Sequence, residues 1–331
     1  MPADPQNMTP IISVIIPTYN YGRFIRHAID SVRRQTLASV QIVVVDDGST
    51  DNTAEMFATT EFVDVKYVRQ DNKGLAGARN TGIATADGEH VFFLDADDAL
   101  HEKALETALQ CMNDHGVDCA MVACRPAVRV LNVETGEERV FEPEEFNQQC
   151  SEPVEVLWRD LMLASRFPPS VLVRRDVLRS CGGFDESFSR MGCEDRDMWL
   201  RVARHHRIWM VPQRLVTVTF HGSNMSGSPE KQVPGIRKCL DKARADSAMP
   251  WWHLGFWMRV RSSFHCTVAM LYWDAGALHQ ALGHQLKGLL SYPFPGLSGE
   301  LKRPHLWRVR RLWVMVREMA IGRASQRGGG K

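Results

Sequence analysis

The sequence predicts an α/β fold: a mostly parallel central sheet flanked by helices, with a helical C-terminal extension. Two observations carry this prediction. The first hundred residues alternate short apolar, β-branched runs with segments that repeat apolar residues every three or four positions. This order is typical of right-handed βαβ units around a parallel sheet. From about Trp251 onward, the patterns are mostly helical.

The elements of the first half follow one another in regular order. The apolar runs typical of buried parallel strands are Ile11–Pro17, Val40–Asp47, Val63–Val68 and His90–Asp97. Helical periodicity separates these runs, and the helices are expected at about residues 24–35, from Asp51, and at 74–86. In such sheets ligands bind beyond the carboxyl ends of the strands. Those ends are therefore where functional residues are expected.

The second half continues with less regular patterns. Helices are expected at 102–115, Val154–Leu163 and Glu194–His205, and strands at 118–131 (one or two), Ser170–Val173 and Ile208–Phe220. Residues 134–146 are acidic and aperiodic, which predicts a surface excursion. Gly, Ser and Pro concentrate at 224–234 and suggest a domain boundary. We therefore expect a disordered lead-in at 1–10, an α/β domain at 11–224 and a helical region at 235–331.

Composition limits the classes of protein. The chain has 331 residues, 44% hydrophobic and 24% charged, which is the balance of a soluble globular protein. A net charge of +1 argues against a protein built to coat nucleic acid. No segment resembles a secretory signal or a bilayer-spanning run, and the eight cysteines contain no C-x-x-C pair. Reduced thiols in a cytoplasmic protein are expected.

Acidic residues gather at two of the expected strand ends. DDGSTD begins at Asp46 and DADD begins at Asp95. A lone acidic pair after a strand commonly caps the next helix, but two clusters at one sheet edge favour a site. Asp95 and Asp97 are two residues apart, so at a strand end they point the same way. Mg²⁺ or Mn²⁺ takes one or two such carboxylates and completes its shell with water and phosphate oxygens.

Further charged groups accompany these clusters. Arg79 and Lys73 lie near a glycine-rich helix start, where they either meet phosphate oxygens or remain solvated. CEDRDMWLRV brings Glu194, Asp195 and Asp197 to a helix start, which is also a common place for acids on dipole grounds. Neither a G-x-G-x-x-G nor a G-x-x-x-x-G-K-[ST] loop is present.

Four ordered segments together resemble family 2 of the inverting glycosyltransferases, which have a GT-A fold. The segments are SVIIPTYNYGRFIRHAIDSVRRQT, QIVVVDDGSTDNT, NKGLAGARNTGIATADGEHVFFLDADD and GGFDESFSRMGCEDRDMWLRV. The resemblance extends over about residues 11–221. It implies a metal-dependent enzyme that moves a sugar from a nucleotide-diphosphate donor, UDP-linked in our expectation, to a hydroxyl acceptor, with cell-surface or lipid-linked glycans as the setting.

The resemblance also implies roles for particular residues. Pro17, Thr18, Tyr19 and Asn20 would line the nucleotide base, with Tyr19 available for stacking. Asp46 or Asp47 would accept a hydrogen bond from the base, and Asp95 would lie near the ribose, beside the donor-binding candidate Arg79 named above. Asp97 would hold Mn²⁺ or Mg²⁺ on the diphosphate, with His221 nearby. Asp195 would be the general base, and Glu194 would lie on the acceptor side.

Two features limit the resemblance, and other functions stay open. The Q-x-x-R-W motif of processive synthases is absent and no membrane-spanning run flanks the expected domain, and both departures favour single additions. A sugar nucleotidyltransferase is an alternative, although it would be expected to carry a glycine-rich basic loop where this chain has PTYNYG. A non-catalytic nucleotide-sugar-binding module is the other.

The C-terminal segment is strongly basic. Residues 301–331 contain nine Lys and Arg and one Glu. Its apolar residues repeat at helical spacing and are Leu306, Trp307, Val309, Leu312, Trp313, Val316 and Met319. Such a helix either lies in a membrane interface or packs on the preceding helices. Peripheral membrane contact, at the inner face of the membrane, is therefore one of two expectations for this helix.

Overall fold

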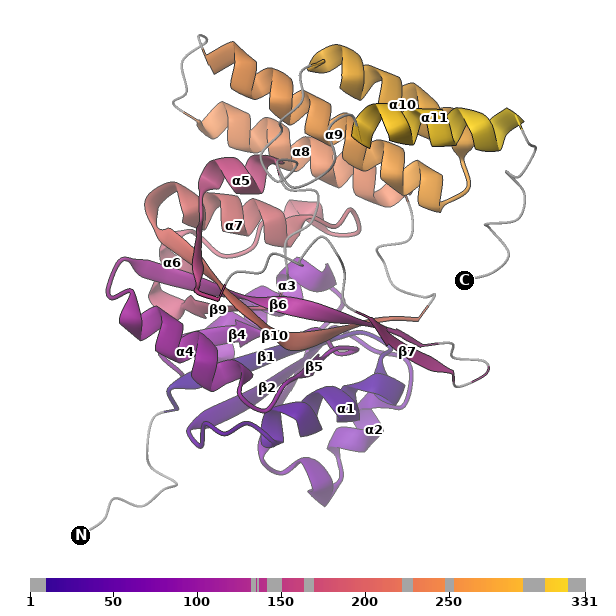
Figure 1. Cartoon of the computed structure of the whole chain (residues 1–331). Helices are drawn as coiled ribbons and strands as arrows, with labels where there is room; N and C mark the ends of the chain where they lie inside the picture. Colours follow the sequence, from indigo (N-terminus) through magenta and orange to yellow (C-terminus); the bar gives the residue numbers. More distant parts are fainter. Residues whose placement is uncertain are drawn as a thin grey trace. The chain divides into compact units, whose positions relative to one another are not determined.

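The computed structural model describes residues 10–131, 135, 137–141, 151–163, 170–221, 229–247, 253–293 and 307–320 (Figure 1). The chain divides into two compact units. The first, here called the sheet unit, comprises Met1–Leu157, Pro168–Arg190 and Asp197–His221. The second, the helical unit, comprises Trp158–Phe167, Met191–Arg196 and Gly222–Lys331. The expected lead-in lies outside the described residues, except for Pro10.

Four parallel strands form the first half of the sheet, in the order β3-β2-β1-β4. They are β1 (Ile12–Thr18), β2 (Val40–Asp46), β3 (Val65–Arg69) and β4 (His90–Phe93). The helices between them are α1 (Gly22–Arg33), α2 (Thr53–Phe57) and α3 (Gly74–Thr85). All seven residues of β1 are buried, as the continuous apolar run predicted.

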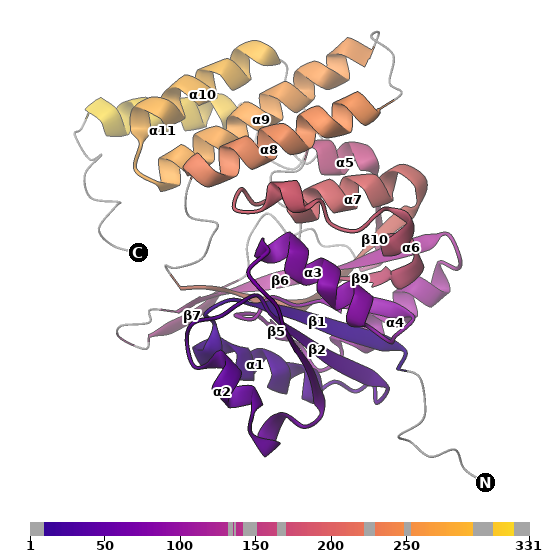
Figure 2. The ribbon, with the colours of Figure 1, turned by 180° about the vertical axis from the view of Figure 1, so that it is seen from behind.

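The helices cover both faces of these strands (Figures 1 and 2). α1 buries Ile25, Ala28, Ile29 and Val32, which repeat at helical spacing and belong to the same apolar cluster as Ile12, Val14 and Ile16. On the opposite face, Gly82 of α3 lies against Ile15, where an added Cβ would be 2.4 Å from Ile15 Cγ2. A glycine therefore lets α3 approach β1 closely.

The second half of the sheet is mixed. After β4 come β9 (Val171–Arg174), β6 (Cys119–Leu131), β10 (Arg207–Phe220) and β5 (Ala99–Leu100). β9 is antiparallel to both β4 and β6, so β6 and β10 run in the direction of β1. Most strands thus share one direction, and the predicted α/β class is confirmed. The accompanying helices are α4 (Ala104–Asp114), α6 (Arg175–Ser180) and α7 (Glu194–His205).

Two short strands correct the expected elements. Residues 138–141 of the expected surface excursion form β7 (Glu138–Phe141), which pairs with the long β6. The expected helix Val154–Leu163 is split into β8 (Val154–Val156), which pairs with β10, and α5 (Trp158–Leu163). In both cases the main chain pairs with the edge of a long strand. That pairing leaves no periodic trace in a segment of three or four residues.

The helical unit contains α8 (Pro229–Asp246), α9 (Leu254–Asp274), α10 (Leu278–Ser291) and α11 (Trp307–Ala320). Met315 of α11 is fully buried and packs with Ala269 and Ala281. The first turns of α8 occupy 229–234, the second half of the glycine- and proline-rich stretch; residues 222–228 lie outside the described part. No helix in the described residues is long and apolar enough to cross a bilayer.

Candidate active site

The carboxyl ends of β1, β2 and β4 lie at one edge of the sheet, because these neighbouring strands are parallel. Thr18 is in register with Asp46, so the PTYN and DDGSTD segments leave the sheet side by side. The DADD segment follows β4 at the same edge. The sheet therefore brings the PTYN, DDGSTD and DADD segments to one edge.

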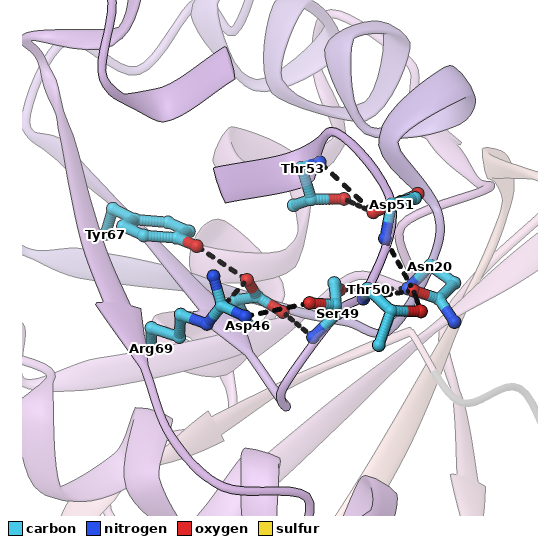
Figure 3. Close-up of polar contacts among 8 residues, drawn as sticks. All are labelled: Asn20, Asp46, Ser49, Thr50, Asp51, Thr53, Tyr67 and Arg69. Atoms are coloured by element: carbon cyan, nitrogen blue, oxygen red, sulfur yellow. Dashed lines mark hydrogen bonds and ion pairs between the residues drawn. The ribbon is translucent and has the colours of Figure 1, made fainter. Parts of the chain in front are cut away.

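Asn20 holds the loop that follows β2 (Figure 3). Its backbone has a φ of 60°, in the left-handed region, and its N–H donates to Ser49 Oγ at 2.9 Å. Its side-chain Oδ1 accepts hydrogen bonds from the N–H groups of Thr50 at 2.7 Å and Asp51 at 3.2 Å. Asn20 was predicted to line the nucleotide base, and its side-chain oxygen is used here to shape the loop.

Asp46 is fully buried at the end of β2. Its Oδ2 accepts from the Tyr67 hydroxyl at 2.6 Å, and its Oδ1 accepts from Ser49 N–H at 2.8 Å (Figure 3). The Arg69 Nε lies 3.9 Å from Oδ2. Burial and the Asp46 carboxylate raise the pKa of the Tyr67 phenol above its usual value, so the phenol stays a donor. Sequence reasoning missed Tyr67, because no local signal ties a tyrosine in β3 to this carboxylate.

Asp47 anchors the start of α3. Its Oδ1 accepts from Gln70 Nε2 at 2.6 Å and from Lys73 N–H at 2.9 Å, and its Oδ2 accepts from Gly74 N–H at 2.8 Å. Lys73 therefore meets this carboxylate through its main chain. Asp47 Oδ1 takes two of these donors, whereas Asp47 Oδ2 and the two oxygens of Asp46 take one hydrogen bond each, so neither carboxylate is saturated. Asp47 accepts three hydrogen bonds from the chain and Asp46 accepts two, so Asp47 has less hydrogen-bonding capacity left for a ligand.

The PTYN segment presents two groups suited to a ligand. Thr18 is buried, and its Oγ1 has no hydrogen-bond partner in the described part of the chain. A buried hydroxyl without a partner is costly, and a bound ligand would relieve that cost. Tyr19 is 46% exposed, which leaves its ring open for stacking, whereas Pro17 is buried in β1.

A turn, and not a strand end, arranges the DADD segment. β4 ends at Phe93, and Asp98 N–H donates to Asp95 O at 3.1 Å. The expected strand extension to Asp97 is therefore wrong, and the alternation of a strand does not orient these carboxylates. Asp95 accepts from Arg79 Nη2 at 3.1 Å, and the buried Arg79 guanidinium lies over the Phe184 ring at 5.4 Å. Asp98 is buried and accepts from Thr219 N–H at 2.9 Å, which ties the turn to β10.

Asp97 and His221 meet across 124 residues of sequence. His221 Nε2 lies 3.0 Å from Asp97 Oδ2, and both side chains are buried. The imidazole stacks on Phe24, with ring centroids 4.5 Å apart, and meets the edge of Tyr21 at 5.6 Å. Burial and the neighbouring Asp95 raise the pKa of Asp97 to about 6, and His221 offsets part of this rise. The carboxylate is thus placed where a cation would stabilise its charged form.

Tyr21 and Phe24 were not expected as site residues. Burial and the Asp97 carboxylate raise the pKa of Tyr21 to about 12, so its hydroxyl remains protonated. Both residues flank the glycine that opens α1, and only the fold brings this helix start to the residue after β10.

The described residues contain no group of three or more His, Cys, Asp or Glu arranged to hold a metal ion. A site for Mg²⁺ or Mn²⁺ does not require one, because these ions accept one or two carboxylates and take their other ligands from phosphate and water. Asp97, its neighbour Asp95 and the nearby His221 fit that pattern.

Glu194 and Asp195 begin α7 in the helical unit, whereas the donor-side residues lie in the sheet unit. Glu194 is buried, and Asp195 Oδ1 accepts from Arg196 N–H at 2.7 Å. Arg196 in turn donates to the carbonyl oxygens of Leu161 and Met162. Asp197, two residues after Asp195, forms an ion pair with Arg201 at 2.9 Å.

Comparisons with known proteins identify the class. The family described as Glycosyl transferase family 2 matches residues 13–182, about half of the chain. Glycosyltransferase GlyG of Streptococcus pneumoniae is 37% identical over 114 residues, 34% of this chain and 38% of that protein. An uncharacterized glycosyltransferase of Rickettsia prowazekii, RP339, is 26% identical over 233 residues, 68% of this chain and 69% of its own length.

Solved structures agree on the fold. Staphylococcus aureus TarS 1-349 in complex with UDP-GlcNAc has a TM-score of 0.58 at 19% identity, over 85% of this chain and 89% of that one. Mannosyltransferase PcManGT from Pyrobaculum calidifontis, in complex with GDP-Man and Mn²⁺, has a TM-score of 0.57 at 18% identity, over 98% of this chain and 88% of its own. The fold is of the GT-A type, and the chain belongs to glycosyl transferase family 2. The predicted family is confirmed.

Proposed function

We propose that this glycosyltransferase moves a single sugar, with inversion, from a nucleotide-diphosphate sugar to a hydroxyl acceptor in cell-surface or lipid-linked glycan synthesis. The observation that carries the proposal is the buried Asp97–His221 pair at the edge where β1, β2 and β4 end. The names of two similar structures support the donor class, since one holds UDP-GlcNAc and the other holds GDP-Man. We favour a UDP-linked donor here.

The proposed contacts with the nucleotide-sugar donor follow from the hydrogen-bonding capacity that remains at this edge of the sheet. Thr18 Oγ1, buried without a partner in the described residues, would bond the base, and the exposed Tyr19 ring would stack on it. Asp46 offers its remaining lone pairs to a base N–H. Asp95, held by Arg79 and partly exposed, would receive the ribose hydroxyls.

Asp97, with His221 beside it, would hold Mn²⁺ or Mg²⁺. When bound, such an ion neutralises negative charge on the departing diphosphate. The chain's own contribution is a carboxylate fixed by burial and by the imidazole at 3.0 Å. A Mn²⁺-containing relative of the same fold supports divalent metal use.

Asp195 would act on the acceptor. Its carboxylate takes the proton of the acceptor hydroxyl as that oxygen bonds to the anomeric carbon, while the bond from that carbon to the diphosphate oxygen breaks. The diphosphate leaves with the electron pair, and attack from the opposite face inverts the anomeric centre. Glu194 would border the acceptor.

Donor hydrolysis tests the proposed function. A panel of UDP- and GDP-linked sugars is incubated with the full chain in Mn²⁺ and in EDTA, and nucleotide release is measured. We expect release of nucleoside diphosphate from one donor class in Mn²⁺, and a loss of at least about tenfold in EDTA. Release of pyrophosphate from a nucleoside triphosphate and a sugar phosphate would instead identify a nucleotidyltransferase. Tight donor binding without any turnover would identify a binding module.

Peripheral membrane contact is proposed for α11. Val309, Trp313 and Val316 lie on one face of the helix and are 46%, 60% and 48% exposed. Arg310 is exposed beside them, and the Arg317 guanidinium lies over the Trp313 ring at 5.6 Å. An apolar face bordered by arginines suits the interface of an anionic bilayer. Leu306 of the predicted stripe lies outside the described residues.

Vesicle flotation tests this contact. At low salt, the full chain is expected to float with phosphatidylglycerol-containing vesicles, and Trp313→Ser is expected to lower the bound fraction about three- to tenfold. Leu290→Ser, which changes a residue of α10 that is 81% exposed, is the matched control. A point variant is preferable to truncation, because Met315 of α11 is part of the core of the helical unit. If Trp313→Ser and Leu290→Ser float equally, the exposed face of α11 does not bind the membrane and the helix serves only in packing.

A further inference from the structure

The helical unit contains a cavity of about 450 Å³ between α8, α9 and α10. All of its lining residues belong to these three helices, and none belongs to the sheet unit. Figure 1 shows the three helices packed side by side. The cavity is therefore a feature of the helical unit by itself.

The spacing of residues on α8 and α9 explains how the cavity is built. Arg237, Leu240 and Arg244 are three and four residues apart on α8, so they share one face. Trp257 and Val260 have the same spacing on α9 and face the cavity too. Leu240 and Val260 are buried, which gives the cavity an apolar wall below a charged rim.

Four cations form that rim, and we call the site the basic pocket. They are Arg237, Arg244, Arg261 and Lys287, and all four are exposed. In the described residues, none of their side chains makes an ion pair or a hydrogen bond. The one acidic residue in the lining, Asp241, is not within ion-pair distance of any of them. Four like charges around one cavity repel one another, and an anion would relieve that repulsion.

Two of the guanidinium groups are held in place by aromatic rings. Arg237 lies over the Phe264 ring at 5.5 Å, and Arg244 lies over the Trp257 ring at 5.2 Å. Stacking occupies the face of a guanidinium and leaves its N–H edge free, which is the edge that binds phosphate in a bidentate manner. The pocket thus offers ordered donors and not only mobile charge.

The pKa of a buried histidine in the lining is affected by the same cations. His265 lines the pocket, and its Nδ1 lies 3.1 Å from His284 Nδ1. Burial, His284 and the cations Arg261 and Lys287 lower the pKa of His265 to about 4. The ring is therefore neutral near pH 7, and the positive charge of the pocket comes from the four cations, which outnumber the one lining carboxylate, Asp241.

We propose that the basic pocket binds a phosphate- or diphosphate-bearing ligand whose neighbouring group is apolar or aromatic. The multiple charge of a phosphate matches four cations better than a single carboxylate does. Leu240, Val260 and the rings of Trp257 and Phe264 provide the apolar contact. A soluble phosphoester and a phospholipid headgroup both carry this chemistry. The proposal stands independently of the donor site and its metal.

Calorimetric titration of the full chain with inorganic pyrophosphate tests the soluble source. EDTA removes metal-dependent binding and low salt preserves the electrostatic attraction to the pocket, and Asp97→Asn is expected to leave this binding unchanged. Arg237→Gln and Arg244→Gln are each expected to weaken binding about three- to tenfold. Lys231→Gln, an exposed cation of α8 outside the pocket, is the control and is expected to bind as the parent does.

Vesicles of phosphatidylcholine with and without phosphatidic acid test the lipid source. If vesicle binding falls in Arg237→Gln but persists in Trp313→Ser, the basic pocket binds the lipid headgroup. Vesicle binding that falls only in Trp313→Ser belongs to α11 and gives the pocket no lipid role. The proposal is overturned if pyrophosphate does not bind and no vesicle binding depends on Arg237, or if Lys231→Gln weakens binding as much as the two arginine variants do.

Discussion

Asp97→Asn is expected to lower kcat by roughly 10³-fold, or about 4 kcal/mol of activation free energy. The amide keeps the shape of the side chain but removes the charge that would hold a divalent ion on the leaving diphosphate. Turnover is measured with saturating donor and with Mn²⁺ raised over two decades. The Mn²⁺ concentration for half-maximal turnover is expected to rise as well.

The fold should survive this change. The pKa of Asp97 is raised to about 6 by burial and by Asp95, so the charged carboxylate is itself unfavourable in the absence of a cation. We expect the Tm of metal-free Asp97→Asn to equal or exceed that of the parent. Asp118→Asn, at an exposed position, is the matched control and should keep full activity. Near-normal turnover of Asp97→Asn at saturating metal would show that the metal site lies elsewhere.

Asp195→Asn is expected to lower kcat for transfer by about 10²- to 10⁴-fold while the Kd for the nucleotide donor changes less than about twofold. A general base acts on the acceptor proton, so its loss appears in turnover and not in donor affinity. Donor affinity is measured by calorimetry, and transfer is measured with the donor identified by the hydrolysis panel.

Asp246→Asn provides the control for this variant, since Asp246 is an exposed carboxylate at the end of α8 in the same unit. It should retain parental kcat. A parallel fall of donor affinity and turnover in Asp195→Asn would make Asp195 a donor-binding or structural residue. Unchanged turnover in Asp195→Asn would exclude it as the base.

The order of elements in the sheet unit could be predicted from sequence, because buried strands and amphipathic helices have different periods. α7 begins and ends where the pattern Glu194–His205 placed it. The clusters PTYN, DDGSTD and DADD were expected at one sheet edge, and the register of Thr18 with Asp46 places the first two there. β7 and β8 were missed because their strand state comes from pairing with long neighbours, not from their own residues.

Composition and periodicity determined the α/β class, and the four ordered segments pointed to the family and to the carboxylates that matter. Only the tertiary structure decided which groups those carboxylates meet. Tyr67 donates to Asp46 from another strand, and His221 reaches Asp97 because β10 ends near the turn after β4. The basic pocket likewise exists only because α8 and α9 face each other. Periodicity tells which side of an element is buried, whereas its partners depend on the packing of segments far apart in the chain.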